Sequence, residues 1–441
     1  MIDINLIRNN KELVKENIRK KFQEHKIIIV DEIEELDKKN RELKIQGDNL
    51  RSERNKISDS IGTLFKEGKT EEANQKKKEV IEINDKLIEI EKQEEELNKA
   101  IREKMMVIPN IIDPSVPIGH DDSENVELEK IGTPLVPDYD IPYHADILES
   151  LGGLDKTSAG KTSGNGFYYL MGDVARLSSA LLSYARDFMI EKGFTYCIPP
   201  FMIRRDVVDG VMSFDEMDAM MYKIEGEDLY LIGTSEHSMI GKYKGEILKK
   251  KELPITMTSY SPCFRKEVGA HGLEERGIYR VHQFEKQEMI VICEPEESME
   301  WYEKMLSYTV ELFKSLNIPV RKLECCSGDL ADLKVKSCDI EAWSPRQQKY
   351  YEVGSCSTLG SAQARRLGIR GKGDKENYDP HTLNNTVLAS TRSLIALVEN
   401  NYQKDGSIII PEVLRPYLGG LEIIKKKYII YKFEYFKLFF T

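Results

Sequence analysis

Two absences narrow what kind of protein this chain is. No apolar run approaches the roughly 18 residues that a membrane-spanning helix needs, and the N-terminal segment MIDINLIRNNKELVKENIRKK is polar and charged. We therefore expect neither a membrane partner nor a signal peptide. The seven cysteines form no CxxC pair and their number is odd, which predicts a reduced, cytoplasmic protein. No Cys/His ligand set is visible, so we expect no zinc.

A third absence concerns nucleotide binding. The sequence contains neither GxGxxG nor GxxxxGK[ST], so it supports neither of the common phosphate-loop folds. With 441 residues the chain is long enough for two or three domains. Its formal net charge of −11 excludes a generic polyanion binder, so any contact with nucleic acid requires a local basic surface.

Residues 27 to 105 contain no proline and almost no aromatic residue. Apolar residues recur there every seven positions, at Ile29, Leu36, Leu43, Leu50, Ile57 and Leu64 and, beyond a break at Glu67–Lys69, at Ala73, Val80, Leu87 and Ile101. The pattern predicts two helices joined by a short turn, in an antiparallel coiled-coil hairpin with arms of about 54 Å. These residues alone leave open a structural or dimerising coiled coil.

Prolines at positions 109, 114 and 117 predict a linker after the hairpin. Beyond it, strand-like pieces outnumber βαβ units, which favours an α+β fold with helices flanking a mainly antiparallel sheet. We therefore expect three domains: residues 1–108 with the helical arm, residues 109–420 with the sheet, and a C-terminal Lys/aromatic extension over residues 421–441. For the extension we favour packing on the body or disorder over a membrane or nucleic-acid contact.

The stretch FRKEVGAHGLEERGIYRVHQFEKQEMI, residues 264–290, has strand-like ends and a glycine-spaced, charged middle. Alternate residues of a strand share a face, which groups Arg265 with Glu267 before the loop and Phe284 with Lys286 and Glu288 after it. Arginine suits bidentate capture of phosphate or carboxylate, phenylalanine can stack on a base, and glutamate can accept from an ammonium or an amino group. A site for a nucleotide and an amine is one interpretation, and a surface ion-pair network is the other.

Two further pieces carry suitable chemistry. Thr234 and Glu236 follow the strand-like LYLIG, and we expect them at the end of that strand, where they could receive a small polar group and a cation. Arg392 lies at the expected start of a helix in ASTRSLIALVEN, where it could meet a phosphate chain. Each signal is weak alone, because helix-end salt bridges and strand-end threonines are common.

Together these pieces form the three signature motifs of class II aminoacyl-tRNA synthetases, and the chain resembles the seryl-tRNA synthetase family over nearly its whole length. The matching stretches are FYYLMGDVARL, GFTYCIPPFM, LYLIGTSEHS, FRKEVGAHGLEERGIYRVHQFEKQE, KYYEVGSCS, HTLNNTVLASTRSLIALVENNY and IPEVLRPYLGG. The stretch from Gly210 to Gly241 is most similar to the archaeal form. The resemblance implies a class II catalytic domain behind a tRNA-binding arm.

The resemblance also implies roles for individual residues. The catalytic residues would be Arg265, Glu288 and Arg392. Serine would be bound by Thr234, Ser235, Glu236, Arg265, Glu288 and Thr386. ATP would be bound by Arg265, Lys266, Glu267, Arg276, Val281, His282, Gln283, Phe284, Glu352, Val353, Gly354, Ser355 and Arg392. Mg²⁺ would be held between the ATP phosphates by Glu352 and Ser355.

The function implied by the resemblance is that of a serine–tRNA ligase. L-serine and ATP would give seryl-adenylate, and the serine would pass to the 3′ end of tRNA(Ser), with tRNA(Sec) as an additional candidate. A homodimer is implied, formed through the helix before Phe194 and the segment up to Pro200. Two alternatives remain: a paralogue that loads an amino acid onto a carrier protein, and a catalytically dead coiled-coil regulator. The heptads argue against the first, and the retained charged motif residues argue against the second.

Overall fold

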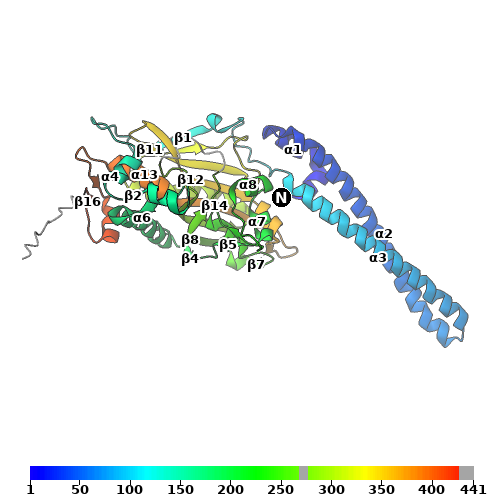
Figure 1. Ribbon diagram of the computed structural model, residues 1–441. Helices are drawn as coiled ribbons and strands as arrows, with labels where there is room; N and C mark the ends of the chain where they lie inside the picture. Colours follow the sequence, from blue (N-terminus) through cyan, green and yellow to red (C-terminus); the bar gives the residue numbers. More distant parts are fainter. Residues whose placement is uncertain (268–276, 427–441) are drawn as a thin grey trace, which may run out of the picture.

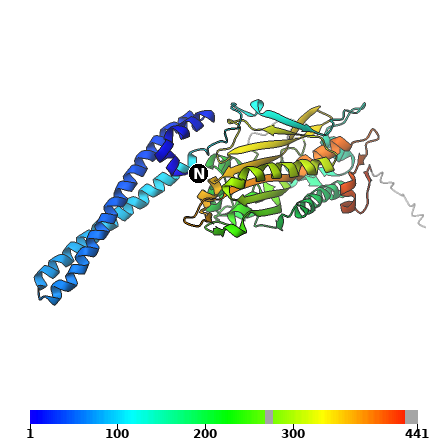
Figure 2. The same cartoon turned by 180° about the vertical axis from the view of Figure 1, so that it is seen from behind.

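The computed structural model describes residues 1–267 and 277–426, and its most prominent feature is a helical arm that extends away from the body (Figures 1 and 2). The arm consists of α2 (Ile27–Lys66) and α3 (Thr70–Val107), joined by the short turn that contains Gly68. Gly68 has φ of +79°, a conformation that glycine adopts without strain. The predicted antiparallel hairpin is confirmed.

Polar residues in the seam of the arm meet partners on the opposite helix. The Asn40 side chain donates to Asn98 at 2.9 Å, and a side chain at Gly47 would meet Ile90. These contacts join α2 to α3 of the same chain, which explains why the heptad pattern tolerates Asn and Gly in its middle. The alternative of a zipper between two chains is therefore not needed to account for the pattern.

The base of the arm is a small domain of its own. Helix α1 (Ile4–Lys20) runs against α2, and Arg8 donates to both carboxylate oxygens of Asp37 at 2.9 and 2.7 Å. A 3₁₀ turn, η1 (Glu24–Lys26), joins the two helices. Buried Val14, Ile33 and Ile101 belong to an apolar cluster under this junction. Burying that apolar surface fixes the arm at its base and leaves its far half projecting.

The body is built on an eight-stranded sheet that is antiparallel except at one edge. Its strands, in spatial order, are β1 (Val126–Ile131), β10 (Val320–Glu324), β11 (Lys336–Ser344), β12 (Lys349–Gly360), β14 (His381–Ala389), β9 (Gln283–Cys293), β8 (Ile255–Phe264) and β4 (Thr195–Cys197). Only β4 pairs in parallel, with β8. The predicted α+β fold with a mainly antiparallel sheet is confirmed.

The two faces of the sheet have different neighbours, and the alternation along β9 shows which is which. Met289, Val291 and Cys293 share an apolar cluster with the long helices α6 (Gly172–Glu191), α11 (Ser298–Ser315) and α13 (Ser390–Asn401). Ile290 and Ile292 belong to a second cluster with the short helices α9 (Ser235–Gly241) and α12 (Ala362–Leu367). The long helices therefore cover one face, and the short helices border the other.

Shorter elements complete the body. The helices are α4 (His144–Ser150), α5 (Lys156–Thr162), α7 (Arg205–Val211) and α8 (Phe214–Met220), and the 3₁₀ turns are η2 (Asp122–Glu124), η3 (Lys250–Glu252), η4 (Pro295–Glu297) and η5 (Glu412–Leu418). Four strand pairs are β2 (Leu154–Asp155) with β3 (Tyr169–Leu170), β5 (Met202–Ile203) with β6 (Tyr230–Leu231), β7 (Ile247–Lys249) with β13 (Arg370–Lys372), and β15 (Ile408–Ile409) with β16 (Ile423–Ile424).

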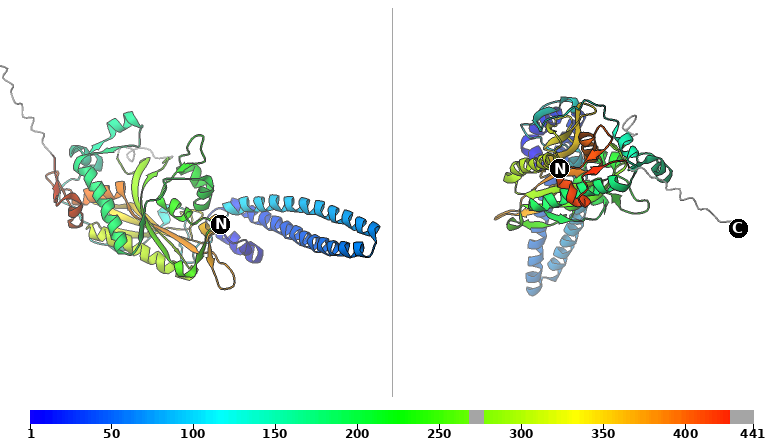
Figure 3. Two further views of the ribbon diagram at one scale, coloured as in Figure 1. Left: turned by 90° about the horizontal axis from the view of Figure 1, so that it is seen from below. Right: turned by 90° about the vertical axis from the view of Figure 1, so that its left-hand side faces the viewer.

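The last of these pairs lies at the end of the body opposite the arm (Figures 1 and 3). The predicted domain boundaries stay predictions. Helix α3 ends at Val107, next to the predicted boundary at residue 108. Strand β16 lies after the predicted boundary at residue 420 and pairs with β15, which lies before it. Residues 427–441 lie outside the described part of the chain. Among the residues that are described, no helix is both long and apolar enough to cross a membrane.

Candidate functional site

The hairpin of β8 and β9 sorts its side chains by face, as the sequence predicts for β9. Phe284, Lys286 and Glu288 line two adjoining cavities on the face bordered by the short helices. Gln283 and Glu285 line a different cavity on the other face. Glu288 is 1 % exposed and pairs with Lys286 at 2.6 Å between the Nζ and Oε2 atoms. A buried carboxylate of this kind needs a cationic partner.

The prediction that Arg265 and Glu267 lie on one face of a strand before the loop is wrong. Strand β8 stops at Phe264, and Glu267 lies beyond it with φ of +44°, in the left-handed region. Arg265 and Glu267 nevertheless line the same cavity, because the chain turns there rather than continuing as a strand. The rest of the predicted glycine-spaced loop up to Arg276 lies outside the described residues.

Two adjoining cavities collect most of the predicted site residues. The polar cavity, of about 320 Å³, is lined by seven of them: Thr234, Glu236, Arg265, Glu288, Glu352, Ser355 and Thr386. The aromatic cavity, of about 60 Å³, is lined by nine: Arg265, Glu267, Val281, Phe284, Glu352, Val353, Gly354, Thr386 and Arg392. Arg265, Lys286, Glu352 and Thr386 line both, so these four residues form the boundary between the cavities.

Thr234 and Glu236 do not end a strand, as the sequence suggested. The strand covers only Tyr230–Leu231, and Thr234 is instead the N-cap of α9, where its Oγ1 accepts from the backbone N–H of Glu236. A threonine is a favoured residue at this position because its side chain satisfies a free N–H of the first turn. The cap places Glu236 in that first turn, at the wall of the polar cavity.

Glu236 is a strongly perturbed carboxyl. Burial raises its pKa to about 7, and the nearby Glu288 adds to the rise, while a bond from Gln363 and the charge of Lys286 act in the opposite direction. Gln363 Nε2 donates to Glu236 Oε1 at 2.8 Å. Glu288, for its part, accepts from Thr386 Oγ1 at 3.5 Å. Glu236 and Glu288 are two buried carboxylates, and Lys286 is the lysine that acts on both. The excess negative charge attracts a further cation.

The aromatic cavity is built from rings and guanidinium groups. Arg265 lies over the Phe284 ring at 5.5 Å, and Arg392 lies over the Tyr279 ring at 4.6 Å, both measured to the ring centroid. Arg392 also donates to Glu352 Oε2 at 2.8 Å. Burial alone would raise the pKa of Glu352, but the Arg392 guanidinium holds that pKa below its ordinary value. Flat rings beside fixed positive charges suit a planar, anionic ligand.

A second acidic group borders Glu352. Strand pairing places Asp339 opposite Ser355, and burial together with the charge of Glu352 raises the pKa of Asp339 to about 7. The half-buried Lys334 counters part of this charge. One oxygen each from Asp329 and Asp339 and the Cys325 thiol also lie within 4.8 Å of one another. Glu352, Ser355 and Asp339 all line the polar cavity, and hard oxygen donors of this kind suit Mg²⁺.

Four predicted site residues line neither cavity. Ser235 is fully buried in the first turn of α9, and Lys266 donates from Nζ to the Asp218 carbonyl at 3.2 Å. His282 Nδ1 lies 3.1 Å from the Tyr222 hydroxyl and 3.0 Å from the Arg265 carbonyl. Gln283 faces the opposite side of the hairpin.

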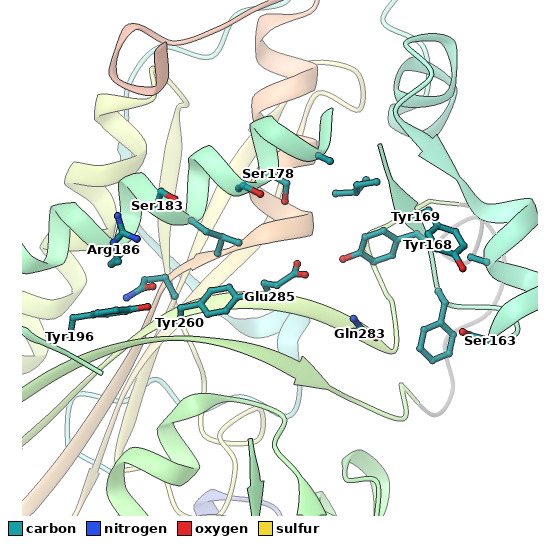
Figure 4. A pocket seen from close by; sticks show the side chains of 17 residues that line it. Ser163, Tyr168, Tyr169, Ser178, Ser183, Arg186, Tyr196, Tyr260, Gln283 and Glu285 are labelled. Atoms are coloured by element: carbon teal, nitrogen blue, oxygen red, sulfur yellow. The ribbon is translucent and has the colours of Figure 1, made fainter. Parts of the chain in front are cut away.

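Gln283 belongs to a larger cavity of about 640 Å³ between α6 and the β8–β9 hairpin (Figure 4). Tyr168, Tyr196, Tyr260, Glu285 and Arg186 point toward this space from separate elements. It lies on the face opposite to Arg265 and Glu288 because odd and even residues of β9 point in opposite directions. The cavity is therefore separate from the acidic and arginine-rich site.

Sequence reasoning missed Tyr279, Lys334, Asp339 and Gln363, and left Lys286 without a role. The period-two pattern of β9 already groups Lys286 with Phe284 and Glu288, so that signal was available. Tyr279 lies within the stretch 264–290, two residues from Val281, so its position was also visible in the sequence. Lys334, Asp339 and Gln363 come from other segments, and only the packing brings them to the cavity wall or to Glu236.

Comparisons with known proteins agree with this architecture. Residues 1–112 match the family model "Seryl-tRNA synthetase N-terminal domain", and residues 221–401 match "tRNA synthetase class II core domain (G, H, P, S and T)". A serine–tRNA ligase of Methanoregula boonei is 42% identical over 428 residues, which cover 96% of this chain and 100% of that protein.

Two solved structures are similar over nearly the whole chain. Seryl-tRNA synthetase from Pyrococcus horikoshii, complexed with ATP, has a TM-score of 0.91 and 42% identity, with 97% of this chain and 100% of that chain covered. Cytoplasmic serine–tRNA ligase from Naegleria fowleri, in complex with AMP, has a TM-score of 0.86 and 32% identity, with 97% and 99% covered.

Proposed function

Because the chain belongs to the seryl-tRNA synthetase family, we propose that its two adjoining cavities are the serine and ATP sites of one active centre. The chain is a serine–tRNA ligase, an aminoacyl-tRNA synthetase that uses ATP. One observation carries the assignment of the sites: most of the residues predicted for serine and for ATP line two cavities that share Arg265. Serine-dependent exchange of pyrophosphate into ATP tests it.

In the polar cavity we place the serine substrate. Thr234 and Thr386 offer hydroxyls, and Glu236 and Glu288 offer carboxylates for the serine ammonium and hydroxyl. Lys286 now pairs with Glu288, so serine must share or displace that ion pair when its ammonium enters. A site that hydrogen-bonds the substrate hydroxyl discriminates strongly against alanine, because its own buried polar groups would otherwise stay unpaired.

In the aromatic cavity we place ATP. Phe284 and Arg392 would enclose the adenine ring, and Glu267 would accept from its amino group. Arg276, which lies outside the described residues, remains a proposed contact to the outer phosphates. The Arg265 guanidinium, between the two cavities, would bridge the serine carboxylate and the α-phosphate, so both reacting groups would be held by one side chain.

The chemical step then needs no protein nucleophile. A serine carboxylate oxygen attacks the α-phosphorus in line, a new oxygen–phosphorus bond forms, and the bond to pyrophosphate breaks. Arg265 stabilises the negative charge that develops on the α-phosphoryl oxygens. In the second step the terminal ribose hydroxyl of the tRNA attacks the seryl carbonyl, and AMP leaves. Positioning and electrostatics carry most of this catalysis.

The residues around Glu352 fit the Mg²⁺ ion that the reaction implies. Glu352 and Ser355 would hold it, and the mutual repulsion between Asp339 and Glu352 favours a divalent cation beside them. When bound, the ion neutralises charge on the ATP phosphates. The chain's own contribution is to orient Glu352, which Arg392 holds through a 2.8 Å bond.

The arm is the proposed contact for tRNA(Ser), and tRNA(Sec) stays a second candidate. Lysines and arginines such as Arg51, Lys76, Lys77 and Lys78 are the candidate phosphate contacts, although Arg51 and Lys76 already pair with acidic neighbours. An RNA ligand would be read by shape and backbone rather than by base edges. A carrier-protein ligase is not favoured, because the arm matches the synthetase N-terminal family.

We place the reaction in the cytoplasm, which seven free thiols support. The protein is also proposed to work as a homodimer through the surface around α6 and β4. Five large apolar side chains in and next to α6 and β3–β5 are exposed by 42–67 %: Tyr169, Met171, Ile190, Ile198 and Met202. Large exposed apolar side chains gathered in neighbouring elements are expected where a partner surface covers them.

Sedimentation should therefore give twice the chain mass of 50.8 kDa at micromolar concentration. Ile190→Asp combined with Ile198→Asp should convert the protein to a monomer, because two charges would be buried at the interface. Ile247→Asp, at an isoleucine that is 53% exposed on β7, is the matched control and should leave the dimer intact. A wild-type monomer, or a dimer that survives the double substitution, would contradict the proposed interface.

The raised pKa of Glu236 predicts how serine binding depends on pH. Its value of about 7 means that the carboxyl is mostly protonated at pH 6 and mostly ionised at pH 8. The ionised form attracts the serine ammonium, so the KM for serine should fall roughly tenfold over that interval. The KM for ATP, measured in the same exchange assay, serves as the control and should change far less. A serine KM that stays flat or rises with pH would contradict this role.

A further inference from the structure

Gln363 is a buried amide that makes three hydrogen bonds, and one of them reaches a predicted serine-binding carboxylate. Its side chain is 0 % exposed at the start of α12. Thr382 Oγ1 donates to Gln363 Oε1 at 2.6 Å, whereas Gln363 Nε2 donates to the Val211 carbonyl at 3.3 Å and to Glu236 Oε1 at 2.8 Å. Both hydrogens of the amide nitrogen are therefore used.

The Val211 carbonyl fixes which way the Gln363 amide faces, because a carbonyl can only accept and therefore meets the NH₂ group. The Thr382 hydroxyl, which is able to donate or accept, then donates to the amide oxygen. A flipped amide would set its oxygen against the Val211 carbonyl and against the Glu236 carboxylate. Glu236 consequently meets a donor at Oε1, which limits how its carboxyl group can turn within the cavity wall.

The helix that carries Gln363 is itself held rigidly. Arg366, one turn further on α12, donates to the carbonyls of Asp209 and Met212 at the end of α7 and to the Met106 carbonyl of the arm helix α3, at 3.1, 2.8 and 2.6 Å. Helices α7 and α12 approach closely at Gly210, where a Cβ would come within 2.2 Å of Leu367. A site held by packed elements and second hydrogen bonds keeps its geometry more accurately than one on a loop.

We propose that Gln363 is a positioning residue for serine, which orients the Glu236 carboxylate so that it receives the substrate. The inference rests on the proposed function of the polar cavity. It adds a residue from outside the three motifs to the determinants of serine affinity. It assigns Thr382 the supporting task of pairing the amide oxygen.

The electrostatics support the same assignment. Burial and Glu288 raise the pKa of Glu236, and the Gln363 bond is the first of the influences that lower it. A hydrogen bond to the charged form favours that form. Gln363 therefore also keeps more of Glu236 ionised near neutral pH. The groups that face Glu236 are Glu288, Lys286, Gln363 and, more distantly, Lys334, and the first two oppose each other in charge.

The test is the serine KM of Gln363→Met, a variant of similar length that cannot donate. In pyrophosphate exchange with the full-length protein, the serine KM should rise at least about tenfold, while the ATP KM stays within about twofold. The pH at which serine binding weakens on acidification should move up by about one unit, because Glu236 loses a donor. A merely structural role would not move that pH.

Two further variants keep the inference open to contradiction. Gln287→Met removes another fully buried amide, which bonds Thr258 at 2.7 Å on the opposite face of β9, and it should lower thermal stability without changing the serine KM. Thr382→Val keeps the shape of its side chain but leaves the Gln363 amide oxygen without its donor, so the amide is held less firmly. It should raise the serine KM a few-fold even if Gln363→Met fails to fold. An unchanged serine KM and pH profile in folded Gln363→Met or in Thr382→Val would overturn the inference. Absence of serine-dependent exchange in the wild type would instead overturn the proposed function.

Discussion

Replacement of Arg265 by alanine is expected to reduce serine-dependent pyrophosphate exchange at least about a thousandfold. Arg265 is one of four residues that line both cavities, and among them it alone carries a fork of donors for a carboxylate and a phosphate together. Loss of one preorganised donor to a developing anionic charge costs about 10²–10³ in rate, and this guanidinium also aligns the two reacting groups. Both the KM for serine and the turnover number should therefore suffer.

The matched control is Arg321→Ala. Arg321 lies on β10, lines neither cavity, and pairs with Glu127 and Glu341. Its loss should leave exchange within about twofold of the wild type. Arg265→Lys should recover little activity, because a single ammonium cannot make two parallel hydrogen bonds. If folded Arg265→Ala retained more than about a tenth of the wild-type exchange rate, the guanidinium would not be the bridge between serine and ATP.

Shortening the arm is expected to separate the two half-reactions. Cross-helix hydrogen bonds pair Asn40 with Asn98 and Arg54 with Asn84, which shows which residues of α2 and α3 lie opposite each other. A variant that lacks residues 45–93 and is closed by a glycine-containing turn therefore joins α2 to α3 at residues that already face each other. The apolar cluster at the arm base, which includes Val30, Ile33 and Ile101, stays complete. Adenylate formation should persist, because no residue of the removed segment lines either cavity.

Charging of tRNA(Ser) by the same variant should fall at least about a hundredfold in kcat/KM. Two lost hydrogen bonds between charged partners already account for a change of that size. Wild-type charging should weaken as salt concentration rises, and the shortened variant should depend on salt less steeply. Serine-dependent exchange, measured in the same preparation, controls for folding. Charging at the wild-type rate by the shortened protein would remove the arm from tRNA recognition.

The elements that the sequence predicts well are those with a long repeated signal. Ten apolar heptad positions and a break at Gly68 define the hairpin without any tertiary information. The sequence also predicts that Phe284, Lys286 and Glu288 share one face of β9, because alternate side chains of a strand point to the same face. The chemistry of residues 264–290 alone fits either a substrate site or a surface ion-pair network. The family resemblance then assigns these residues their roles in binding serine and ATP.

The failures come from places where the chain departs from a regular period. LYLIG reads as a strand, yet only Tyr230–Leu231 pairs, because Thr234 already caps the following helix. Glu267 has a left-handed backbone conformation, which the pattern of charged residues does not predict. Asp339 reaches the polar cavity through the register of β11 against β12. Gln363 reaches Glu236 through the docking of α12, which depends on residues more than a hundred positions away.

The most direct test of the central claim is amino-acid-dependent pyrophosphate exchange by the wild-type protein, with serine, threonine, alanine and glycine each supplied alone. The cavity lined by Thr234, Glu236, Glu288 and Thr386 predicts rapid exchange with serine and at least about a hundredfold less with each of the other three. Equal or faster exchange with threonine, alanine or glycine, or no exchange with serine, would contradict the assignment of this cavity and of the reaction.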